Sequence, residues 1–195
     1  MVTVERLSEA AWQSLRDVRL AALLDAPEAF WATWQDERRY ARQDWVGFAR
    51  GVVWFIARNG PPPGRLPVGV VGCLRREEFP DEPEVIGMWV RPEQRGTGTA
   101  DLLIEAAHRW ADTVHVRSLA LWVVDGNERA RRFYARHRYL PTGERAPLPA
   151  RRQGQERRMR RTWPTPFDEA ARAPEILQSP SPRWAQPVEA TEDPR

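Results

Sequence analysis

The segment from Val85 to Trp110, VIGMWVRPEQRGTGTADLLIEAAHRW, restricts the fold more than any other part of the sequence. It begins with an apolar run, passes through a turn at Gly96 and Gly98, and continues with apolar residues at helical spacing. A strand that leads through glycines into a helix leaves backbone N–H groups unpaired at the positive end of the helix dipole. This order of elements predicts an anion-binding site, with phosphate as the expected ligand.

Two familiar phosphate-binding motifs do not fit this turn. The P-loop requires a lysine, and the chain has none, because all 30 of its Lys and Arg residues are arginine. The dinucleotide-binding fingerprint requires a third glycine at the position of Asp101. A Gly-x-Gly turn before a helix also serves as a purely structural turn in many proteins. Its meaning therefore depends on the motifs around it.

The remaining patterns predict an α/β (α+β) domain in which strands and helices alternate. The run at 119–124 is apolar on both faces, which is typical of a buried central strand, and the turn-rich NGPPPGRLP segment indicates a hairpin. Helices are expected from Ser8, as the N-cap, to Ala26, in a second, aromatic-rich region, and over Gly98–Val114 and Glu128–Arg136. Strands are expected at Val2–Leu7, Val52–Arg58, Val68–Arg76, Glu84–Val90, Leu119–Val124, Tyr139–Glu144 and Gln155–Trp163.

Composition predicts one folded domain over residues 1–163 and a different segment over residues 164–195. The 195 residues are 42% hydrophobic, which is enough to bury one full core. From Pro164 to Arg195, seven of 32 residues are proline and no apolar period continues. We expect this Pro-rich tail to be extended or disordered.

Several classes of protein do not fit the sequence. Cys73 is the single cysteine, which excludes an internal disulfide framework and a metal site built on several thiolates. His108, His115 and His137 lack metal-binding spacing, so no metal is expected. The sequence shows neither a signal peptide nor an apolar run of about 18 residues, so we expect a cytoplasmic protein without a membrane partner.

The arginine-rich run from Arg151 to Arg161 raises the question of nucleic acid. It is interrupted by Glu156 and lacks aromatic residues for base stacking, so we expect a solvated strand face. A nucleic-acid binder is the less favoured alternative, and it predicts salt-sensitive binding to DNA or RNA.

Two linked motifs carry a family resemblance. VRPEQRGTGTADLLIEAA is followed, after one more strand, by DGNERARRFYARHRYLPTGE. Together they resemble the GCN5-related N-acetyltransferase (GNAT) family over most of Val2–Trp163, with Arg95, Gly98 and Ala100 in its pyrophosphate signature. The resemblance implies a central, mixed, mostly antiparallel sheet of about seven strands, splayed between two parallel central strands and with helices on both faces.

The resemblance implies acetyl-CoA as the co-substrate. The pantetheine arm would pair with the free strand edge at Met88, Trp89 and Val90, and the Val90 N–H would stabilise the oxyanion. Core packing of Met88 and Trp89 is compatible with that role. The remaining cofactor contacts would come from the pyrophosphate loop and from the start of the next helix: Arg95, Gly96, Thr97, Gly98, Thr99, Ala100 and Asn127.

Tyr134 and Glu84 are the predicted catalytic residues. A tyrosine stays protonated at neutral pH and can donate to the leaving thiolate, whereas the alternative for Tyr134 is a core aromatic. Glu84 stands where some family members have a glutamate that removes the amine's proton, but it also belongs to an acidic run typical of a solvated loop. Phe30, Trp31 and Trp34 would form the acceptor wall, with core burial equally expected.

The implied activity is transfer of an acetyl group to a primary amine, more often that of a small molecule, by direct attack in a ternary complex. A non-catalytic acyl-CoA sensor and a protein N-terminal acetyltransferase are the alternatives, and a homodimer is left open. One departure from the family pattern concerns the turn after the last helix. Arg138 and Tyr139 stand where members have Gly-Phe, which costs about 1 kcal/mol if the first position is left-handed.

Overall fold

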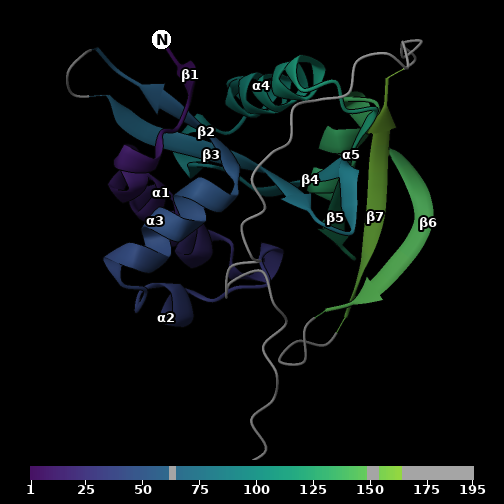
Figure 1. The fold of residues 1–195 in the computed structure, drawn as a ribbon, viewed down its shortest axis with the longest axis horizontal. Coiled ribbons are helices and arrows are strands. Elements are labelled where there is room, and N and C mark those ends of the chain that lie inside the picture. Colours follow the sequence, from purple (N-terminus) through teal and green to yellow (C-terminus); the bar gives the residue numbers. More distant parts are fainter. Residues whose placement is uncertain (62–64, 149–153, 164–195) are drawn as a thin grey trace, which may run out of the picture.

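A seven-stranded mixed sheet is the centre of the computed structural model, which describes residues 1–61, 65–148 and 154–163 (Figure 1). The strand order is β1-β2-β3-β4-β5-β7-β6, and every neighbouring pair is antiparallel except β4 and β5. The predicted fold class is therefore confirmed, whereas the predicted tail lies outside the described residues. The strands are β1 (Thr3–Arg6), β2 (Val53–Asn59), β3 (Leu66–Arg76), β4 (Phe79–Val90), β5 (Ser118–Val124), β6 (Leu140–Pro147) and β7 (Gln155–Thr162).

Helices cover both faces of the sheet, and alternation along the strands explains why. In β2, Trp54 and Ile56 belong to the core beneath α1 and α3, whereas Phe55 and Ala57 belong to the core beneath α4. None of the helices in the described ranges is long and apolar enough to cross a membrane. The α-helices are α1 (Trp12–Asp25), α2 (Trp34–Glu37), α3 (Arg42–Gly51), α4 (Thr99–Thr113) and α5 (Glu128–Arg136), and the 3-10 turns are η1 (Glu9–Ala11), η2 (Pro27–Ala29) and η3 (Pro92–Gln94).

Two local predictions were wrong. The Ser8 side chain caps nothing, because η1 lies between it and the first residue of α1. The acidic segment before Glu84 is a loop only at Glu77 and Glu78, because β4 begins at Phe79, which pairs with Arg76 of β3 across this two-residue turn. The run is exposed as far as Asp81, as expected, but antiparallel pairing with β3 makes its second half a strand.

The arginine-rich segment is also less solvated than the sequence indicates. Its described part is β7, which pairs with β5 on one side and β6 on the other. Arg158 is buried, and its guanidinium binds Glu82 and Glu144. These carboxylates neutralise the strand from within the domain, which removes an argument for phosphate binding there.

Arg138 occupies the left-handed conformation that the family motif anticipates for glycine, with φ of 64°. The Tyr139 N–H donates to the Tyr134 carbonyl at 3.0 Å, so the turn closes α5 with the bond that defines a Schellman motif. The departure from the family sequence therefore leaves the turn in place, and the strain is confined to one residue.

Candidate active site

The two parallel strands of the sheet form a fork. The ladder between β4 and β5 consists of the pair Glu84 and Ala120, in two strands that are described throughout. On the N-terminal side of this pair the strands stay tied, because the Ser118 hydroxyl donates to Glu82 at 2.8 Å. Beyond it, towards their C-terminal ends, β4 and β5 run on without pairing. The sheet is thus open where the chain enters the glycine turn.

The open edge of β4 presents a backbone donor at Val90. The Arg91 N–H donates across the ladder to Val68 at 2.8 Å, so the preceding pair, Val90 and Gly69, is a non-hydrogen-bonded pair. The N–H and C=O of Val90 consequently point away from β3, towards the fork. The Trp89 backbone is paired with Val70, so the Met88 carbonyl, on the other side of the same peptide group, faces the fork.

The glycine turn after β4 is open to approach by a ligand. Gly96 and Gly98 have φ of 82° and 84°, and a Cβ built on either would meet no atom within 4 Å. Gly98 is the N-cap of α4, and the Thr97 hydroxyl is bonded to Gln94 and Thr99. No acceptor within the described residues binds the N–H groups from Gly96 to Ala100. These donors lie at the positive end of a 15-residue helix, as an anion site requires.

Unlike the residues that follow it, Arg95 has no free backbone N–H to offer to an anion. Its backbone N–H donates to Pro92, its Nε donates to the Val90 carbonyl at 3.0 Å, and its terminal nitrogen binds Asp25. Asp25 also accepts a bond of 2.8 Å from the Trp89 indole. Asp25, the last residue of α1, therefore joins that helix to β4 and to the loop. No local pattern in the sequence indicates this contact, because Asp25 and Arg95 are 70 residues apart.

We expect an Asp25→Asn variant to raise the KM for acetyl-CoA about tenfold while kcat changes less. Loss of the charged acceptor frees Arg95, and hydrogen bonds to charged groups contribute about 1.5–3 kcal/mol. Steady-state kinetics with acetyl-CoA as the varied substrate measures this. Asp17→Asn is the matched control, because Asp17 lies exposed on the same helix and contacts only its neighbour Arg16 among the described residues. An unchanged KM in a folded Asp25→Asn variant would contradict the positioning role.

Asn127 follows β5 as the N-cap of α5, and Tyr134 lies on that helix. The Asn127 side chain accepts the Ala130 N–H at 3.0 Å, so it caps α5. Tyr134 is 8% exposed and packs against Phe133 and Tyr139. Burial raises the pKa of its hydroxyl above the usual range, and no described residue forms a hydrogen bond with that hydroxyl. The core position and the predicted acid role are compatible, and the latter stays a prediction.

Glu84 lies at the base of the fork and is held on both sides. Its Oε2 accepts a bond of 2.8 Å from Arg76, and its Oε1 accepts one of 3.2 Å from the Trp122 indole. Each oxygen thus accepts one hydrogen bond, and an ionised carboxylate can accept further ones. Its predicted role as the base is not tested by this placement.

The three aromatic residues predicted for the acceptor wall are separated by the fold. Phe30 is buried and stacks under Arg19 at 4.9 Å, and Trp34 begins α2 beneath Arg38. Trp31 is 49% exposed and reaches the far part of the sheet, where its Nε1 donates to Glu156 at 2.9 Å. The structure thus brings one of the three, Trp31, against the strands beyond the fork.

Glu156 is a candidate functional residue that the sequence predicted only as part of a solvated strand. It is 2% exposed and pairs with Val124 at the end of β5. Burial raises its pKa to about 7; the Trp31 hydrogen bond opposes this shift and the negative charge of Glu84 adds to it. A single glutamate in an arginine run was the only available signal.

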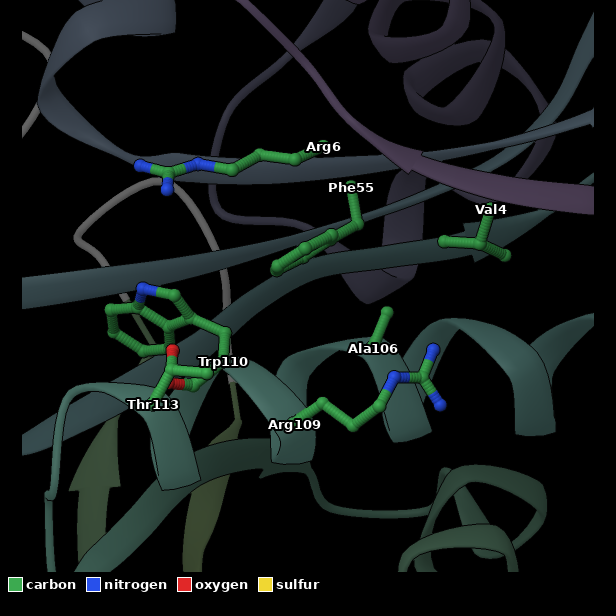
Figure 2. A pocket seen from close by; sticks show the side chains of 7 residues that line it. All are labelled: Val4, Arg6, Phe55, Ala106, Arg109, Trp110 and Thr113. Atoms are coloured by element: carbon green, nitrogen blue, oxygen red, sulfur yellow. The ribbon is translucent and has the colours of Figure 1, made fainter.

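A separate hollow lies at the other end of α4 and does not belong to this site. Its lining comes from β1, β2 and the C-terminal half of α4, and Figure 2 shows Phe55 and Trp110 between two arginines. It therefore lies on the face opposite α1. The hollow is lined by Val4, Arg6, Phe55, Ala106, Arg109, Trp110 and Thr113.

Within the described ranges, no cluster of three His, Cys, Asp or Glu side chains is arranged to hold a metal ion.

A fork between two parallel strands, next to an open glycine loop at a helix N-terminus, fits an extended ligand with a phosphate group. The chain matches the model of the acetyltransferase (GNAT) family over residues 12–139. It therefore belongs to that family, and membership implies acyltransferase activity. No curated protein matches the chain in sequence.

Solved structures share the fold at low sequence identity. A GNAT-family acetyltransferase from Streptococcus pneumoniae is 15% identical with a TM-score of 0.66, covering 84% of this chain and all (100%) of that one. A Salmonella typhimurium protein solved with its cofactor acetyl-CoA is 15% identical with a TM-score of 0.67, covering 91% and 99%. The ribosomal-protein-S18-alanine N-acetyltransferase from Escherichia coli is 13% identical with a TM-score of 0.61, covering 88% and 99%.

Proposed function

We propose that the protein transfers the acetyl group of acetyl-CoA to the primary amine of a small molecule, by direct attack in a ternary complex. The observation that carries the proposal is the fork, with the free Val90 N–H on one edge and the open glycine loop directly beyond it. The donors from Gly96 to Ala100 would hold the diphosphate, and the edge at Met88 and Val90 would pair with the pantetheine arm. A structural neighbour from Salmonella typhimurium was solved with acetyl-CoA, which supports the same co-substrate here.

A cationic acceptor fits the carboxylates on the face of the sheet that is turned away from α4. Glu82, Glu84 and Glu156 lie on β4 and β7 on the face turned away from α4, and Trp31 covers part of that face. Glu82 and Glu84 are bound to arginines, so Glu156 is the carboxylate of this face that would attract an ammonium group. The Val90 N–H would stabilise the negative charge on the thioester oxygen, and Tyr134 would donate a proton to the departing sulfur.

Turnover with a panel of amines tests the function. The panel contains aliphatic diamines, aminoglycosides, amino acids, benzylamine and peptides with a free N-terminal alanine, and release of free thiol is measured with acetyl-CoA. We expect small cationic amines to react fastest. Calorimetric binding of acetyl-CoA without turnover of any amine would instead support a non-catalytic acyl-CoA sensor, and preference for the peptides would support a protein N-terminal acetyltransferase.

A further inference from the structure

Glu156 faces the acceptor side of the sheet. Met159 of the same strand belongs to the core beneath α4. Side chains alternate between the two faces along a strand, so Glu156, three residues before Met159, points to the other face. Glu156 therefore shares its face with Ala120 and Trp122 of β5, and with Glu84, which pairs with Ala120. The segment that connects α1 and α2 reaches this face through Trp31.

One oxygen of Glu156 remains free within the described part of the chain. Its Oε2 accepts the Trp31 indole N–H at 2.9 Å, and no described residue donates to Oε1. Although Glu156 is buried, its Oε1 is not fully covered, so this oxygen retains access to solvent or a ligand. Glu84 differs, because each of its oxygens already accepts a hydrogen bond, from Arg76 and from the Trp122 indole. Among the described residues Glu156 has no arginine partner, so of the two carboxylates it is the less engaged.

We propose that Glu156 binds the ammonium group of the acceptor through Oε1 and takes its proton, with the Trp31 indole covering the carboxylate and the acceptor's apolar part. This assignment rests on the function proposed above and names a small, cationic primary amine as the substrate class. It replaces Glu84 with Glu156 as the base.

The ammonium loses one proton to Glu156, and the nitrogen lone pair then forms the C–N bond with the thioester carbon while the carbonyl electrons move to oxygen. When the C=O bond re-forms, the C–S bond breaks and its electrons leave with sulfur. Tyr134 gives a proton to the thiolate, the second nitrogen proton returns to the Tyr134 phenolate, and Glu156 releases its proton to solvent.

The charged groups around Glu156 are compatible with a base that works near neutral pH. Glu84 is the facing acid from β4, and its negative charge favours the protonated form of Glu156. Arg158, next on the same face of β7, is bound to Glu82 and Glu144, and Asp125 after β5 is bound to Arg157 and Arg145. A buried carboxyl with a pKa of about 7 is half ionised at neutral pH and accepts a proton efficiently.

The test uses the best acceptor of the panel and a Glu156→Gln variant, which keeps the shape of the side chain. We expect the acetyl-CoA dissociation constant and the melting temperature to stay near wild type, while kcat/KM for the amine falls about 100-fold or more. In the wild type, kcat/KM falls as the pH drops through about 7, because Glu156 becomes protonated. In Glu156→Gln this acid limb of the pH profile disappears, and kcat/KM instead rises with pH as the free amine accumulates. Glu105→Gln, on the exposed face of α4, is the matched control.

Trp31→Phe supplies a second variant that leaves the carboxyl group in place. Removal of the indole N–H takes away a bond that favours the ionised form, so the acid limb of kcat/KM should move to higher pH. If wild-type protein acetylates an amine and a folded Glu156→Gln variant retains more than half its kcat/KM and its pH limb, Glu156 is not the base, and the proposed function stands. If the wild type acetylates no amine while it binds acetyl-CoA, the proposed function fails and this assignment fails with it.

Discussion

A Tyr134→Phe variant is expected to fold normally and to lose about 100-fold or more in kcat. The change removes the hydroxyl and keeps the ring that packs against Phe133 and Tyr139. Positioned acid catalysis typically contributes 10²–10⁴-fold. Burial raises the pKa of the Tyr134 hydroxyl, so the hydroxyl is protonated before the reaction and has a proton to give to the departing thiolate. Because the diphosphate and pantetheine provide most of the ground-state binding, the KM for acetyl-CoA should change little.

Tyr139→Phe is the control for this variant, because the two tyrosines differ in their partners. The Tyr139 hydroxyl lies 3.2 Å from His108 Nε2 in a fully buried hydrogen bond, whereas the Tyr134 hydroxyl binds no described residue. We expect Tyr139→Phe to lose about 1 kcal/mol of unfolding free energy while its kcat stays normal. Tyr134→Phe should keep its unfolding free energy and lose kcat. Single-turnover rates isolate the chemical step from product release. A Tyr134→Phe rate above half of wild type would remove the acid assignment.

A Gly98→Glu variant should lose at least about 100-fold in affinity for acetyl-CoA. Gly98 is the N-cap of α4, and its missing Cβ leaves open the space in front of the loop N–H groups. A glutamate side chain would enter that space and bring a negative charge to the position expected for the diphosphate. Isothermal titration calorimetry measures the affinity directly, without an acceptor.

The backbone cost of this substitution can be separated from its effect on the ligand. A residue with a Cβ at φ of 84° costs about 1 kcal/mol, so the melting temperature should fall slightly. Gly143 of β6 has φ of 88° and equally open space around a Cβ, so Gly143→Glu carries the same strain away from the loop. Equal acetyl-CoA affinities in the two folded variants would show that the loop does not bind the diphosphate.

The glycine loop was predictable from sequence because its determinants are local. Gly96 and Gly98 lie within one turn, and the apolar period of α4 begins directly after them. The same is true of Asn127, which caps the helix that carries Tyr134, and of the left-handed turn at Arg138. Short-range sterics and hydrogen bonds decide such features, so a single sequence contains them.

Strand boundaries and burial were less predictable. The acidic run before Glu84 and the arginine run around Glu156 have the composition of solvated segments, yet β4 and β7 place residues from both within the sheet. A charged residue becomes buried only when an oppositely charged or hydrogen-bonding partner meets it, as Glu82 meets Arg158. The partner comes from another strand, and its distance in the chain hides the pairing from any local pattern.

By itself, the sequence determined the order of elements, the glycine turn before α4 and the family motif, because spacing and backbone conformation are fixed within a few residues. Only the tertiary structure decided which side chains surround the fork. Trp31 meets Glu156 across 125 residues, and Asp25 meets Trp89 across 64. Such contacts depend on how α1 and the segment after it dock on the sheet, which the packing of the whole core sets. The acceptor side of the site is therefore a product of that packing.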